Sequence, residues 1–76
     1  MDKMKPREVG GMVSRAKCIY VWVPYLETED TDHGIWLAVK KSQARDILNA
    51  AKEDDHLVFA CERRGEVYIG CGPDPE

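Results

Sequence analysis

The sequence contains few of the features that mark enzymes and metal-binding proteins. Only three of its 76 residues are cysteines, and no two of them form a CxxC pair. It has no GxSxG, HExxH or phosphate-loop motif, so the usual signatures of serine hydrolases, zinc proteases and nucleotide-binding enzymes are missing. A chain of this size also has little room for a ligand pocket of the usual ~300 Å³ or more. We therefore expect a non-catalytic protein without a metal or another cofactor.

Long apolar runs are missing as well. The longest covers residues 18–26, with Pro24 counted, and is far shorter than the ~20 residues that a membrane-spanning helix needs. Residues 1–15 lack the apolar stretch of a secretory signal. An odd and sparse set of cysteines is not typical of a secreted domain of this length. These absences favour a cytoplasmic protein that does not bind membranes, with Cys18, Cys61 and Cys71 as reduced thiols.

Charge is distributed unevenly along the chain. The net charge is −3, but residues 1–17 hold five basic and two acidic side chains, a local +3, and the remainder carries −6. Phosphate contacts dominate the affinity of proteins for duplex nucleic acid, so the acidic remainder does not favour such a partner. The basic segment leaves nucleic acid open as an alternative partner.

The predicted elements begin after an irregular segment. Residues 1–12 have no hydrophobic periodicity and contain a proline and the Gly10-Gly11 pair, which predicts a flexible N-terminal arm. Strand-forming residues dominate residues 13–25 and 35–40. The connection between them is too short for a parallel crossover, so we expect an antiparallel hairpin with a long acidic loop.

A helix is expected next. Ser42 is a favourable N-cap residue, and no glycine or proline interrupts the segment that follows. Four apolar residues recur there at helical spacing and form one narrow stripe: Ala44, Ile47, Leu48 and Ala51.

A second hairpin follows the helix. Residues 57–62 and 66–71 predict two strands around a turn that contains a glycine. A two-residue turn would place Val67 on the face of Glu62, and a three-residue turn would place it with Phe59. We expect the three-residue turn, because it keeps Glu62 off the core and gathers the larger apolar set.

These elements predict an α+β fold with the order ββαββ. The sheet would have four antiparallel strands in the order 2-1-3-4, with one helix on one face. The first strand is apolar on both sides, which suits a central position. Residues 13–72 would form a single α+β domain, between the arm at residues 1–12 and a tail at residues 73–76.

One helix can cover only one face of this sheet. The strand alternation then places four aromatic residues on the other face: Tyr20, Trp22, Trp36 and Tyr68. Because monomeric soluble proteins rarely expose a large contiguous apolar patch, we expect this face to form a homodimer interface. Coverage by the N-terminal arm and stacking with single-stranded nucleic acid are the alternatives.

The long loop of the first hairpin is strongly acidic. Its carboxylates are Glu27, Glu29, Asp30 and Asp32, a composition that suits a hard cation but does not match the spacing of an EF-hand loop. We expect these acids to contact a basic protein partner, and a solvated loop and a metal site stay open as alternatives.

The sequence therefore predicts a small interaction module of the inhibitor or regulator type. It would associate with itself through the aromatic sheet face and present its acidic loops to a protein partner. The alternative is a module that binds single-stranded nucleic acid or RNA through the same aromatic face.

Overall fold

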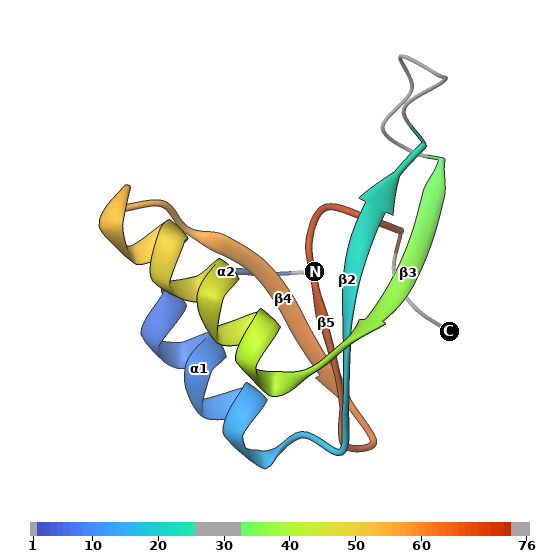
Figure 1. The fold of residues 1–76 in the computed structure, drawn as a ribbon, viewed down its shortest axis with the longest axis horizontal. Coiled ribbons are helices and arrows are strands. Elements are labelled where there is room, and N and C mark those ends of the chain that lie inside the picture. Colours follow the sequence, from blue (N-terminus) through green and yellow to red (C-terminus); the bar gives the residue numbers. More distant parts are fainter. Residues whose placement is uncertain (1, 26–32, 74–76) are drawn as a thin grey trace.

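The computed structural model describes residues 2–25 and 33–73, and these residues form a five-stranded sheet with two helices on one face (Figure 1). The elements, in chain order, are β1 (Asp2–Met4), α1 (Pro6–Arg15), β2 (Cys18–Pro24), β3 (Gly34–Val39), α2 (Lys41–Glu53), β4 (Val58–Arg63) and β5 (Glu66–Ile69). The prediction of an α+β protein is confirmed, but the predicted number and order of its elements differ from those observed. In the described part of the chain, no helix has the length and apolar character needed to cross a membrane.

The N-terminal segment is ordered, so the prediction of a flexible arm was wrong. Pro6 occupies the first turn of α1, where its missing N–H costs nothing, and the helix buries Val9, Met12 and Val13. This spacing of three and four residues is an apolar helical stripe, which the Gly10-Gly11 pair obscured. Burial of that stripe outweighs the low helix propensity of two glycines.

The strand order also differs from the prediction of 2-1-3-4. The sheet runs β1-β4-β5-β2-β3, and β5 rather than β4 lies beside β2. The β2–β5 pair is parallel, with Ile19 opposite Val67, and the other three pairs are antiparallel. It follows that each helix links two parallel strands, α1 from β1 to β2 and α2 from β3 to β4. Two parallel strands need a long crossover connection, which each helix provides here. A hairpin turn can join only antiparallel strands.

The β4–β5 hairpin has the shorter of the two turns considered. Arg63 lies opposite Glu66, so the turn contains only Arg64 and Gly65, with φ angles of 51° and 82°. Positive φ at both turn residues matches the right-handed twist of the flanking strands, and this twist favours the turn over the predicted three-residue one. The register therefore turns Phe59 and Cys61 away from the helices.

The other face of β4 carries Ala60 and Glu62 toward the helices. A carboxylate is tolerated at this position because it lies at the margin of the core. There it approaches a guanidinium nitrogen of Arg15 on α1, at 3.8 Å. The prediction that kept Glu62 off the helix side did not foresee this second helix.

The core is a thin layer between the sheet and the two helices. It consists of small and medium apolar side chains: Val9, Met12, Val13, Ala16, Ile19, Ala44, Leu48, Ala60, Val67 and Ile69. None of the described polar or charged residues is buried. The hairpin of β2 and β3 extends past the ends of both helices, which leaves Val23, Ile35 and Leu37 on its helix side largely exposed (Figure 1).

Candidate interaction surface

The sheet face opposite the helices carries the four aromatic residues that the sequence singled out. Tyr20 and Trp22 lie on β2, Trp36 on β3 and Tyr68 on β5. Tyr20 is level with Tyr68 across the parallel pair, and Trp22 is opposite Trp36 across the antiparallel pair. We call these four residues the aromatic cluster. Because β2 lies between β3 and β5, the cluster spans three adjacent strands.

The rings of the aromatic cluster contact one another directly. Tyr20 and Tyr68 are stacked, with centroids 5.1 Å apart and planes at 17°. Trp36 makes edge contacts with both Trp22 and Tyr68, each at 5.2 Å. Such pairs contribute about 0.5–1.5 kcal/mol each beyond the area that they bury. The four rings therefore form one connected, half-buried unit.

Three glycines surround Trp22 and hold the chain close to its ring. A Cβ atom at Gly72 would lie 2.5 Å from two ring atoms of Trp22 and 2.8 Å from a ring atom of Trp36. A Cβ at Gly34 or Gly70 would also lie within 2.8 Å of Trp22, and Gly70 has a φ of 129° that disfavours any other residue. The segment after β5 thus packs on one side of the aromatic cluster. The N-terminal arm, proposed from sequence as a cover, instead forms β1 and α1.

Polar groups line the end of the cluster that carries the tyrosines. The Tyr68 hydroxyl donates a hydrogen bond to a carboxylate oxygen of Glu66 at 2.5 Å. This bond favours the protonated hydroxyl and raises the pKa of Tyr68 to about 12. Electrostatic interactions with Cys18 and with Glu66 raise the pKa of Tyr20 as well. A carboxylate therefore lies directly beside the aromatic rings.

Three further residues of this face were not predicted from the sequence: Lys3, Phe59 and Cys61. Phe59 lies on the open side of β4, and the ammonium group of Lys3 on β1 lies 5.2 Å from its ring centroid. Cys61, opposite Tyr68, is on the same side. Only the two-residue turn, which was the alternative register, would have placed Phe59 and Cys61 on this face. No local pattern predicted that β1 would bring Lys3 beside Phe59.

The acidic loop is not part of the described structure. Glu27, Glu29, Asp30 and Asp32 all lie outside the described residues. The hairpin is closed before the loop by a hydrogen bond from the Tyr25 amide to the His33 carbonyl, at 3.0 Å.

The described cysteines and acids do not gather into a site. Cys18 and Cys71 are exposed, Cys61 is half-buried, and none of the three described cysteines forms a disulfide. Within residues 2–25 and 33–73, no group of three or more His, Cys, Asp or Glu side chains is arranged to hold a metal ion.

Comparisons with models of known protein families, with curated proteins and with solved structures found no match to this chain.

Proposed function

We propose that this protein is a non-catalytic interaction module that forms a homodimer through its open sheet face. The observation that supports this proposal is the aromatic cluster, a connected group of four half-buried rings on a face that neither helix covers. A face of this composition resembles the centre of a protein interface, where Tyr and Trp are enriched.

The ring geometry favours a protein surface over a run of nucleic-acid bases. Base stacking needs an aromatic ring whose flat face is open. Tyr20 and Tyr68 instead stack on each other, and Trp36 directs its contacts at its neighbours. The Glu66 carboxylate beside Tyr68 would also repel a phosphate backbone.

A dimer of standard size would bury a modest part of the surface of this chain. A stable interface buries about 800 Å² on each partner, which is roughly one seventh of the 5624 Å² surface of this chain. One face of a five-stranded sheet can supply an area of that order. A two-fold dimer would pair the same patch on both copies, and its helices would then lie on the outside.

The acidic loop completes the proposal. Its four carboxylates (Glu27, Glu29, Asp30 and Asp32) would contact a basic surface of a protein partner, in keeping with the acidic composition of that segment. The dimer would thus present two such loops, and this arrangement is that of a small inhibitor or regulator.

The dimer is tested by two lysine substitutions on neighbouring residues of β3. Ala38 is exposed on the open face opposite Tyr20, and Leu37 is exposed on the helix side. We expect the unmodified protein to sediment at twice 8.6 kDa at micromolar concentration. Ala38→Lys should give a folded monomer, because it places an unpaired charge in the interface, and Leu37→Lys should remain a dimer.

Other results would contradict this arrangement. A dimer disrupted only by Leu37→Lys would place the interface on the helix side of the hairpin. A monomeric wild-type protein would remove the dimer. If that monomer also bound a single-stranded oligonucleotide with an affinity that falls steeply with salt, the face would belong to the nucleic-acid alternative.

A further inference from the structure

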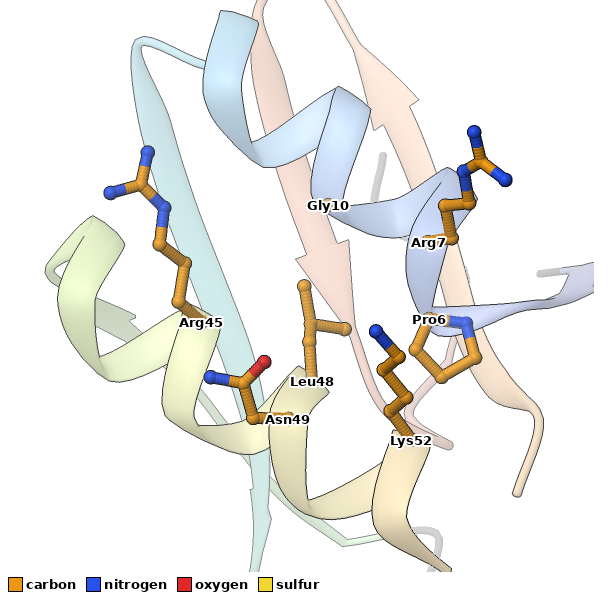
Figure 2. Close-up of a pocket in the computed structure, with 7 residues that line it drawn as sticks. All are labelled: Pro6, Arg7, Gly10, Arg45, Leu48, Asn49 and Lys52. Atoms are coloured by element: carbon orange, nitrogen blue, oxygen red, sulfur yellow. The ribbon is translucent and has the colours of Figure 1, made fainter. Parts of the chain in front are cut away.

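The two helices enclose a groove on the outer side of the molecule. It has a volume of about 190 Å³ and lies between one flank of α1 and one flank of α2 (Figure 2). The residues that line this interhelical groove are Pro6, Arg7, Gly10, Arg45, Leu48, Asn49 and Lys52. The α2 residues recur at spacings of three and four, so they share one face of that helix.

The charge of the interhelical groove is entirely positive. Arg7, Arg45 and Lys52 line it, and no carboxylate does. In the described part of the chain, none of these three cations is in an ion pair. Figure 2 shows the Lys52 ammonium group between Leu48 and Pro6, with the two guanidinium groups on opposite sides. In a chain of net charge −3, three unpaired cations around one hollow indicate a site for an anion.

A second hollow adjoins the interhelical groove. It shares Pro6, Arg7 and Lys52 with the first and has a volume of about 280 Å³. Its other lining residues are Lys5, Asp55, His56 and Leu57. Leu57 is 55% exposed there, which offers an apolar surface beside the cations. The positive charge of Lys5 offsets the negative charge of Asp55, the one acid that lines this second hollow.

Gly10 leaves part of the groove wall without a side chain. A Cβ atom at Gly10 would meet nothing within 4 Å. The open space beside it belongs to the groove that Gly10 lines. Any larger residue at this position would project a side chain into that groove.

We propose that the interhelical groove and the adjoining second hollow together bind a phosphate monoester, with the phosphate between Arg7 and Lys52 and its apolar substituent on Pro6 and Leu57. A phosphate monoester carries a charge of about −1.5 to −2 at pH 7, which matches three cations better than a carboxylate does. Guanidinium groups bind phosphate through paired N–H donors, which Arg7 would supply here, and Arg45 lies across the groove, where it adds to the positive charge. The small volume suits one anionic group better than a drug-sized ligand.

The test uses phenyl phosphate as the probe and a matched pair of glutamate variants. Gly10→Glu places a carboxylate in the groove. Gly11→Glu makes the same change of net charge one residue away, at an exposed position that does not line the groove. Both variants should fold at least as well as the wild type, because each replaces a helical glycine. We expect Gly10→Glu to weaken phenyl phosphate binding at least tenfold, and Gly11→Glu to leave it within about twofold.

Calorimetry and amide chemical shifts measure the binding of phenyl phosphate. Further ligands then test which class of anion the site prefers. Benzoate should bind at least tenfold more weakly than phenyl phosphate. A 5′-phosphorylated oligonucleotide that binds more tightly than its unphosphorylated form would place the phosphate on a nucleic-acid end. Equal effects of the two glutamates, or no binding of phenyl phosphate, would overturn the proposal. None of these outcomes depends on the dimer, because the groove lies on the helix side.

Discussion

The Tyr68 hydroxyl has a strongly perturbed pKa. Its partner, Glu66, stabilises the protonated form through a 2.5 Å hydrogen bond and so raises the Tyr68 pKa to about 12. The unfolded chain has the ordinary tyrosine pKa of about 10. The contribution of this bond to stability is therefore fully present below pH 10 and is lost as the pH rises from about 10 through 12.

We expect the ultraviolet titration of the folded protein to include one tyrosine that ionises near pH 12. Glu66→Gln removes the carboxylate and should move this transition to lower pH, whereas Tyr68→Phe should abolish it. A transition that is unchanged in Glu66→Gln would show that Glu66 is not its cause. The control is Glu53→Gln, since Glu53 is an exposed residue at the end of α2.

At the scale of elements, α1 is the least expected part of the molecule. It packs beside α2 and over β4, and it contributes Val9 and Val13 to the core with no exposed surface. Without this helix, the core would lose one side of its helix layer. The segment at residues 1–12 is therefore a structural part of the domain.

Val9→Ala tests this conclusion. Removing two buried methyl groups should lower the free energy of unfolding by about 2 kcal/mol, from the lost burial and the cavity that remains. Ser14→Ala, on the exposed side of the same helix, should change it by less than about 0.5 kcal/mol. Urea denaturation measures both values. Equal and negligible effects would mean that α1 does not pack on the sheet.

At the scale of the whole molecule, the helix layer and the open face differ in chemistry. The helix layer carries the cationic interhelical groove, and the open face carries the aromatic cluster with Glu66. The four acids that we propose for the partner lie in the loop of the β2–β3 hairpin, outside the described residues. A face-to-face dimer would leave the grooves accessible on its two outer sides.

The proposed partner surface is tested by charge replacement. Changing Glu27, Glu29, Asp30 and Asp32 to serine should abolish binding of an oligolysine peptide at low salt, because the attraction to a basic surface is lost. We expect the melting temperature to change little. A control variant replaces three other acids with serine: Glu53, Asp54 and Asp55. If only the control variant loses peptide binding, the acidic surface is at the end of α2 rather than in the loop.

Local periodicity was enough to predict several features. Alternation along β2 and β3 separates Tyr20, Trp22 and Trp36 from Ile19 and its neighbours, because successive residues of a strand point to opposite faces. Part of the apolar stripe of α2 is equally local, since it follows from 3.6 residues per turn. Ala44 and Leu48 are buried as predicted, whereas Ile47 is 39% exposed. These patterns depend only on backbone geometry within one element, so they could be predicted before the elements were assembled.

The remaining features depend on contacts between distant segments. The sequence alone did not determine that β5 lies beside β2, that the turn at Gly65 has two residues, or that Gly72 packs on Trp22. Competing registers and strand orders differ little in local propensity, and only the shared burial of the whole core selects among them. The interhelical groove also depends on contacts between distant segments. The sequence determined the cations on each helix, and tertiary packing placed the two flanks side by side.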